Sequence, residues 1–251
     1  MAGVLGRVAL VTGAGRGIGL AAAQTLAARG ARVMCVSRSR HELAATGLDY
    51  AVADLGSADG CALAVTDTEQ RLGPIELLIC NHGIGSAAER VVWEQDPDVW
   101  HETMRINLDG PFYLSRLVMR SMRQRGYGRI VYTSSTAGLL AEPAGSAYTT
   151  SKHGLLGLMR SVAEDGGAHG ITANAVLPGW VRTAMAERSA QAEAERRKIT
   201  ADDVWRERAA LYRANRIVSC QEVAEVIAFL ASEESSGVSG EAIRVALGSV
   251  W

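Results

Sequence analysis

The chain has 251 residues, and its 26 basic and 27 acidic side chains leave a formal net charge of −1. Because no long block of like charge occurs either, the sequence excludes the strongly basic surface that draws proteins to nucleic acid or anionic membranes. A small molecule is the expected partner, and we predict neither nucleic-acid nor membrane binding.

The cysteines are distributed without the paired spacing of a redox or metal motif. Cys35 and Cys80 lie inside apolar runs that indicate buried strands, so we expect reduced core thiols. An apolar strand begins within a few residues of Met1, which leaves no room for a signal peptide, and no stretch approaches the ~20 apolar residues of a membrane span. We therefore expect a cytoplasmic protein, and the scattered Cys and His residues predict no metal site.

Short β-branched runs alternate with longer helical patterns along the chain. The runs that predict strands are 7–12, 31–36, 50–53, 76–80, 129–133, 172–176 and 243–246. Because these runs are apolar on both faces and are separated by helices, they favour a parallel sheet covered on both sides. We predict one α/β domain over residues 1–251, a Rossmann-type doubly wound sheet of about seven strands.

A long segment interrupts this alternation after the sixth predicted strand. Residues 184–216 carry alternating charges and alanines where a short connection would suffice. We expect this helical insertion to be a substrate lid, with a solvated helical pair that only lengthens the fold as the alternative.

A glycine-rich loop, Thr12-Gly13-Ala14-Gly15-Arg16-Gly17-Ile18-Gly19, follows the first predicted strand directly. Glycines at this point let the chain turn tightly and let backbone N–H groups approach a pyrophosphate at the start of the next helix. An ordinary strand–helix turn is a poor alternative for a loop in this position. The residues that we predict to contact a dinucleotide cofactor are Gly13, Gly15, Arg16, Gly17, Ile18 and Gly19.

The end of the second predicted strand lacks the carboxylate that normally holds the ribose 2′-hydroxyl of NAD. The sequence there is Ser37-Arg38-Ser39-Arg40, so Arg38 can pair with a 2′-phosphate and Arg16 can approach it from the glycine loop. Ser37 and Arg38 therefore favour NADP(H) over NAD(H). If Arg38 and Arg40 were merely exposed charges, the missing acid would stay unexplained.

A serine, a tyrosine and a lysine in the second half of the chain indicate acid/base chemistry. Ser135 follows the fifth predicted strand, and Tyr148 and Lys152 lie one helical turn apart on the same helix face. A tyrosine with a reference pKa of ~10 is a weak base at neutral pH, but a cation about 4 Å away contributes about 4 kcal/mol at an effective dielectric constant near 20. We predict Tyr148 as the acid/base, Lys152 as its cation and Ser135 as a hydrogen-bond donor to the substrate oxygen.

Together these motifs resemble the short-chain dehydrogenase/reductase family, from Gly6 to about Gly240. The family's T-G-x-x-x-G-x-G, serine, Y-x-x-x-K and P-G motifs match Thr12 to Gly19, Ser135, Tyr148, Lys152 and Pro178-Gly179. The resemblance implies that the catalytic set is Asn107, Ser135, Tyr148 and Lys152, with Asn107 holding a water in a proton relay. It implies further cofactor contacts from Asp54, which meets the adenine, from Thr183, which holds the nicotinamide carboxamide, and from Leu55, Asn81, Gly83, Tyr148, Lys152, Pro178, Gly179 and Val181.

The chain departs from the family pattern in several places. The family's N-N-A-G appears as Cys80-Asn81-His82-Gly83, the segment after the second predicted strand is short, and V-D-G-G reads Val245-Ala246-Leu247-Gly248. His82 adds bulk and a possible donor beside the cofactor, although a lone histidine is more often structural. The changed carboxy-terminal motif bears on the homotetramer or homodimer that the resemblance implies.

Within the family, the second half of the chain resembles 3-hydroxybutyrate dehydrogenases. The positions that fix a carboxylate in those enzymes hold Gly85, Ala137, Gly145 and Ser189 here. A small hydroxy-acid anion would therefore lack its anchor. We predict a carbonyl reductase that interconverts a fairly apolar or bulky ketone and its secondary alcohol, in a pocket lined by Leu139, Leu140, Trp180 and Met185.

Two other functions stay open on the sequence. The basic cluster Arg116, Arg120, Arg123, Arg125 and Arg129 suggests docking of an acidic carrier protein, and hence a 3-oxoacyl thioester reductase, although such clusters are more often solvated helix ends. The fold also binds dinucleotides without catalysis, as in an NADP-sensing protein, but the complete set of Ser, Tyr, Lys and Asn argues against that function.

Overall fold

The structure, a computed structural model, describes residues 3–85 and 90–249. This part of the chain builds a seven-stranded parallel sheet with the strand order β3-β2-β1-β4-β5-β6-β7. The strands are β1 (Val8–Thr12), β2 (Arg32–Ser37), β3 (Asp49–Val52), β4 (Leu77–Cys80), β5 (Gly128–Thr133), β6 (Ile171–Pro178) and β7 (Ala242–Val245). The predicted strands and the Rossmann-type fold class are confirmed, with strand ends shifted by a residue or two.

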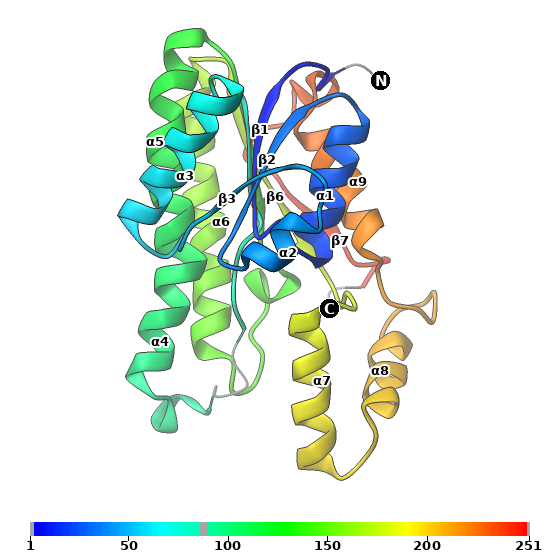
Figure 1. Ribbon diagram of the computed structural model, residues 1–251. Helices are drawn as coiled ribbons and strands as arrows, with labels where there is room; N and C mark the ends of the chain where they lie inside the picture. The colour runs from blue at the N-terminus through cyan, green and yellow to red at the C-terminus, as the bar shows by residue number, and fades with distance from the viewer. Residues whose placement is uncertain (1–2, 86–89, 250–251) are drawn as a thin grey trace.

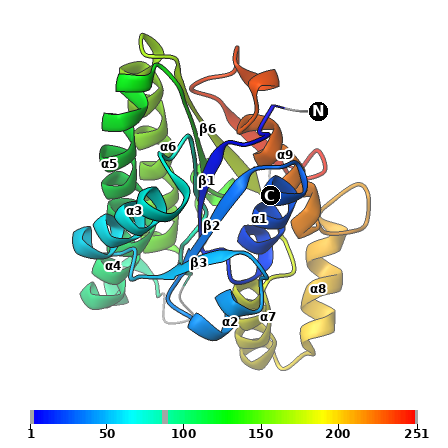
Figure 2. The same ribbon diagram turned by 45° about the horizontal axis from the view of Figure 1, so that its top comes forward.

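Helices cover both faces of the sheet, as Figures 1 and 2 both show. One layer holds α3 (Ala58–Leu72), α5 (Gly110–Arg125) and α6 (Ser146–Gly167), and the opposite layer holds α1 (Gly17–Ala28) and α9 (Cys220–Leu230). The short helix after β2 is α2 (Arg40–Ala44). This doubly wound arrangement explains why each strand is apolar on both faces.

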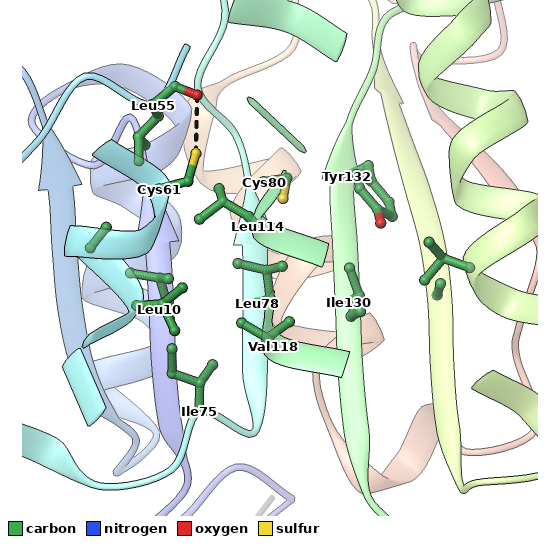
Figure 3. Close-up of a cluster of buried hydrophobic side chains, with 14 of the residues drawn as sticks. Leu10, Leu55, Cys61, Ile75, Leu78, Cys80, Leu114, Val118, Ile130 and Tyr132 are labelled. Atoms are coloured by element: carbon green, nitrogen blue, oxygen red, sulfur yellow. Dashed lines mark hydrogen bonds between the residues drawn. The ribbon is translucent and has the colours of Figure 1, made fainter. Parts of the chain in front are cut away.

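Figure 3 shows part of the core between the sheet and helices α3 and α5. Leu10, Leu78 and Ile130 come from neighbouring strands and pack against Leu114 and Val118 of α5, with all five side chains buried. The preceding residue of β1, Ala9, belongs to the core on the other face. Burial on alternate sides is the reason that the strands could be located as short apolar runs.

The cysteines of the described chain are free, as predicted, and three of them are buried. The thiol of Cys61 donates to the carbonyl oxygen of Leu55 at 3.3 Å, as Figure 3 shows. Burial raises the pKa of Cys61 to about 12. The thiol therefore stays protonated at physiological pH and serves as core rather than as a nucleophile.

The carboxyl ends of the strands meet at one edge of the sheet, which is the lower edge in Figure 1. Helices α4 (Pro97–Met104), α7 (Ala184–Arg197) and α8 (Ala201–Ala210) extend beyond this edge. Parallel sheets bind ligands at this edge, because loops from every strand converge there. The fold thus gathers the segments in which the sequence placed its candidate residues.

The predicted insertion after the sixth strand is the helix pair α7 and α8, which has a small core of its own. The guanidinium of Arg208 on α8 lies 3.6 Å from the ring centroid of Trp180, which follows β6. The same group donates to Glu193 on α7 at 3.0 Å, and only 5% of Arg208 is exposed. A buried cation–π stack and an ion pair therefore anchor both helices to the segment after β6.

Candidate active site

The glycine loop between β1 and α1 has a backbone that only glycine adopts easily. Gly13 and Gly17 have φ angles of 63° and 58°, in the left-handed region that a Cβ disfavours. A Cβ on Gly19 would lie 2.3 Å from the carbonyl oxygen of Gly13. Ile18 lies on the first turn of α1, whose N-terminus carries no capping side chain. The loop thus leaves backbone N–H groups and bare backbone for an anion, which fits a pyrophosphate.

Residues from two other strands close around this loop. The side-chain amide of Asn81, after β4, donates to the carbonyl oxygen of Thr12 at 3.2 Å. A Cβ on Gly17 would lie 3.3 Å from the side chain of Thr183, which follows β6 and caps α7. Pro178 ends β6, and the backbone of Gly179 continues its pairing with Val245. The predicted phosphate and nicotinamide residues therefore lie side by side.

A carboxylate on α2, Glu42, lies beside the glycine loop and was not singled out from the sequence. Arg38 is exposed and forms no ion pair with any described residue, whereas Arg16 is paired with Glu42 of α2. A Cβ on Gly15 would meet Glu42 at 2.9 Å and the hydroxyl of Ser37 at 3.4 Å. The missed signal was helix capping: Ser39 caps α2 and accepts from the N–H of Glu42, which turns that residue back toward the loop.

Asp54, after β3, is held by two donors. It accepts from the N–H of Gly56 at 3.1 Å and from the guanidinium of Arg105 at 3.0 Å. Although burial raises the pKa of Asp54, the Gly56 N–H and the Arg105 cation outweigh it and hold the pKa below its usual range. Asp54 is therefore ionised, and its neighbour Leu55 is buried. Arg105 is a second residue that the sequence did not single out.

Lys152 is more deeply buried than Ser135 and Tyr148, the other predicted catalytic residues that carry an ionisable group or a hydroxyl. Its ammonium donates to the carbonyl oxygen of Thr133 at 3.0 Å and lies 5.5 Å from the ring centroid of Tyr148. Burial lowers the pKa of Lys152 to about 8. Ser134 donates to the carbonyl oxygen of Lys152 at 3.0 Å, so the end of β5 is tied directly to α6. Ser135, the next residue, accepts from the backbone of the short turn that follows.

Asn107 lies in the π-helical turn Arg105–Asp109, between α4 and α5. Its side chain accepts from the N–H of Ile84 at 2.7 Å, and it donates to the Ile84 carbonyl at 2.8 Å and to Ser151 at 3.1 Å. A Cβ on Gly83 would lie 3.2 Å from the Asn107 oxygen and 3.5 Å from the Lys152 nitrogen. The structure thus brings Asn107 beside Lys152, and glycine at position 83 makes this approach possible.

The expected substrate side of Tyr148 faces the start of α7. A Cβ on Gly85 would lie 3.4 Å from the sulfur of Met185 and 3.7 Å from the ring of Tyr148. Leu139 is 44% exposed and offers apolar surface nearby in the chain. Ser189 is exposed and accepts from Arg208 at 3.1 Å, so its hydroxyl is already engaged.

Within residues 3–85 and 90–249 no group of three or more His, Cys, Asp or Glu side chains has the arrangement of a metal site. Among the helices described, none is both long and apolar enough to cross a bilayer.

Comparisons with known proteins agree with this geometry. Residues 7–194 match the family model described as short chain dehydrogenase. The chain is 34% identical over 250 residues to the 3-oxoacyl-[acyl-carrier-protein] reductase FabG of Escherichia coli (strain K12), covering 96% of each. It is 32% identical over 245 residues to the D-beta-hydroxybutyrate dehydrogenase of Cupriavidus necator, covering 94% of each.

Solved structures of two reductases are also similar to the chain. Levodione reductase superposes with a TM-score of 0.92 at 30% identity and 97% coverage of both chains. A variant of the actinorhodin polyketide ketoreductase, solved with NADPH, has a TM-score of 0.90 at 30% identity and 96% coverage of both.

The burial of Lys152 leads to a stability prediction. Lys152→Met should raise the melting temperature of the cofactor-free protein near neutral pH, because it removes a buried cation. The folded-state pKa of about 8 lies below the unfolded value of ~10.4. Between these values the unfolded chain holds a proton that the folded chain has released, so wild-type stability rises with pH. The advantage of the variant should therefore be largest below pH 8 and shrink above it.

Thermal unfolding of both proteins across this range provides the measurement. Lys198→Met is the matched control, because Lys198 is the other lysine of the chain and is exposed; it should show no such trend. A gain for Lys152→Met that stays constant with pH would contradict the assigned burial cost.

Proposed function

The chain belongs to the short-chain dehydrogenase family, and from this premise we propose that it is an NADP(H)-dependent carbonyl reductase. Its substrate is a fairly apolar or bulky ketone, which it interconverts with the secondary alcohol. The observation that carries the proposal is the buried Lys152 ammonium beside Tyr148, at the edge where the glycine loop opens.

The cofactor residues have the shape that a dinucleotide needs. The positive φ angles and absent Cβ atoms of the glycine loop leave room for a pyrophosphate, which Gly13, Gly15, Gly17 and the start of α1 would hold. Asn81 and Gly83 would flank the nicotinamide half, together with Thr183. When bound, the nicotinamide ring supplies or accepts the hydride.

The four polar residues then divide the proton work. In reduction, the phenol of Tyr148 gives its proton to the ketone oxygen as the carbon becomes an alcohol; in oxidation, the phenolate takes that proton back. The Lys152 cation favours the phenolate and so tunes Tyr148. Ser135 donates a hydrogen bond to the substrate oxygen and stabilises its developing charge. Ile84 and Ser151 use both N–H donors of the Asn107 side chain, so a water held by Asn107 would donate to one of its carbonyl oxygens, in the side chain or the backbone.

Preference for NADP(H) rests on Ser37 and Arg38. Arg38 is exposed and unpaired within the described chain, so it is available to a 2′-phosphate. Arg16 can add a second contact if the phosphate competes with Glu42, its present partner. The similar polyketide ketoreductase was solved with NADPH.

An apolar substrate is favoured because two arginines at the insertion, Arg182 just before it and Arg208 within it, are already paired with carboxylates. Arg182 is bonded to Glu187 at 2.6 Å, and Arg208 to Glu193 at 3.0 Å. Neither guanidinium is therefore free to anchor a substrate carboxylate. We propose that residues 184–216 act as the lid of a single domain, with Met185 as its contact beside Tyr148.

We also propose that the protein works in the cytoplasm as a homodimer or homotetramer. Its support is a groove of about 370 Å³ over α5 and α6, lined by both apolar and charged side chains. Phe112 on α5 is 47% exposed, and a second copy packed on this helix would cover it.

A second candidate function is 3-oxoacyl thioester reduction. The similarity to FabG favours it, and Arg116, Arg120 and Arg123 line the groove over α5 and α6 as a basic surface for an acidic carrier protein. If the protein reduces carrier-bound thioesters and the rate falls steeply as the salt concentration rises, this function is favoured over ketone reduction.

Tyr148→Phe should reduce turnover to less than about a few per cent of wild type while NADPH binding stays within about twofold, because only the proton-transferring hydroxyl is lost. Steady-state ketone reduction and a fluorescence titration with NADPH measure the two effects. If the variant keeps a larger fraction of the wild-type rate, Tyr148 is not the acid/base. If the wild-type protein itself binds NADPH but turns over no ketone, the sensor function is favoured.

Arg38→Asp should shift the preference from NADP(H) toward NAD(H) by about tenfold or more, because it removes a phosphate partner and supplies a ribose acceptor. Glu42→Gln should strengthen NADPH binding, since it frees Arg16 and removes a nearby negative charge. Arg40→Asp is the control for Arg38→Asp, because it makes the same change in net charge at an exposed arginine two residues away. Parallel titrations with both cofactors measure this preference, and tighter NAD(H) binding by the wild-type protein would overturn the assignment.

Acetoacetate and 3-hydroxybutyrate should be poor substrates, with kcat/KM at least about tenfold below that of bulky aryl and cyclic ketones. A buried carboxylate without a paired charge is costly, and Gly85, Ala137 and Gly145 offer no side-chain donor. A substrate panel with NADPH measures this. Acetoacetate outperforming the panel would point to Arg188, which is exposed and has no partner among the described residues, as the anchor.

A further inference from the structure

The π-helical turn that carries Asn107 leaves one backbone carbonyl without a helical partner. The N–H of Gly110 donates to the carbonyl of Arg105, five residues back, rather than to that of Ile106. In this register the donor to Ile106 would be residue 111, which is proline and has no N–H. Pro111 is buried, so water does not easily replace the missing donor.

The imidazole of His82 lies against this turn. Its Nε2 is buried and has no hydrogen-bond partner at normal distance and angle among the described residues. A Cβ on Gly110 would lie 2.7 Å from this nitrogen. Burial and the Lys152 cation lower the pKa of His82 to about 3, while the backbone of Ile106 acts in the opposite direction. The ring is therefore neutral at physiological pH and carries a single proton.

The surroundings of Thr12 place that proton. The hydroxyl oxygen of Thr12 already accepts from the N–H groups of Asn81 at 2.9 Å and His82 at 3.2 Å, which uses both of its lone pairs. Its single proton has two acceptors within reach, the His82 Nδ1 at 2.8 Å and the Ile79 carbonyl oxygen at 3.0 Å. A third N–H donated from the ring would exceed the lone pairs of the hydroxyl oxygen, so the arrangement favours donation to Nδ1. The Ile79 carbonyl, the other acceptor near this hydroxyl, also receives the Asn81 N–H at 3.1 Å. With Nδ1 accepting, the proton of His82 resides on Nε2, facing the turn.

We propose that His82 is a positioning residue. Its Nε2–H donates a hydrogen bond to the Ile106 carbonyl, which receives none from Pro111 because proline has no N–H. This bond fixes the turn that holds Asn107. The series of hydrogen bonds from Thr12 through His82 to Ile106 links the start of the glycine loop to the π-helical turn. This role rests on the proposed function, because its consequence is the placement of Asn107 beside Lys152. It also accounts for a histidine where the family pattern has alanine.

A double-mutant cycle tests the exchange of donors. His82→Leu should lower kcat by about tenfold and lower the melting temperature, because it leaves a buried carbonyl unpaired, while the KM for NADPH changes by less than about threefold. Adding Pro111→Ala supplies an N–H to Ile106, so the double variant should regain at least about threefold in kcat and part of the lost melting temperature. Pro111→Ala alone should have the smaller effect.

The melting temperatures are measured without cofactor or substrate, so this arm stands even if the proposed reaction is wrong. Additive effects of the two substitutions on melting temperature would overturn the donor exchange. Coupling in melting temperature with wild-type kcat for His82→Leu would overturn the positioning role. His101→Leu, on an exposed histidine of α4, is the control and should leave both quantities unchanged.

Discussion

The buried ammonium of Lys152 is the constraint around which the carboxyl edge of the sheet is arranged. A cation with 4% exposure is expensive to bury, and the contacts that hold it also fix its neighbours. The Lys152 ammonium donates to the carbonyl of Thr133, the last residue of β5. The hydroxyl of Ser134 donates to the backbone carbonyl of Lys152. Gly83 leaves the space in which Asn107 approaches. A site poised for proton transfer is in this way part of the packing between β5, β4 and α6 rather than an addition to it.

The absence of side chains is as important as their presence. A Cβ on Gly19 would lie 2.3 Å from the Gly13 carbonyl oxygen, and a Cβ on Gly110 would lie 2.1 Å from the Leu55 carbonyl oxygen and 2.7 Å from the imidazole of His82. The close approaches at Gly110 lie between segments far apart in sequence. The cofactor loop and the π-helical turn are thereby brought within one side chain of each other, and His82 is the side chain that spans them.

The sequence predicted the strands, the glycine loop and the Ser–Tyr–Lys group because each signal is local. Burial on both faces gives short apolar runs, and helix periodicity alone places Tyr148 and Lys152 on one face. Glu42, Arg105 and Arg208 escaped prediction because their roles depend on which loop or helix lies opposite, and periodicity carries no such information. The strand ends shifted for a similar reason, since pairing with a neighbour extends β6 to Pro178.

The insertion differs from the rest of the edge in how its charges are used. At the cofactor end Arg38 is left without a partner in the described chain, whereas in the insertion Glu187 pairs with Arg182 and also accepts from the indole of Trp205. Exposed ion pairs of this kind contribute little stability, but they neutralise cations that would otherwise attract an anionic substrate. The buried stack of Arg208 on Trp180 does the same while filling the space between the helices. In the proposed function, the paired Arg182 and Arg208 would therefore favour neutral substrates at one end of the site, and Arg38 would favour a phosphate at the other.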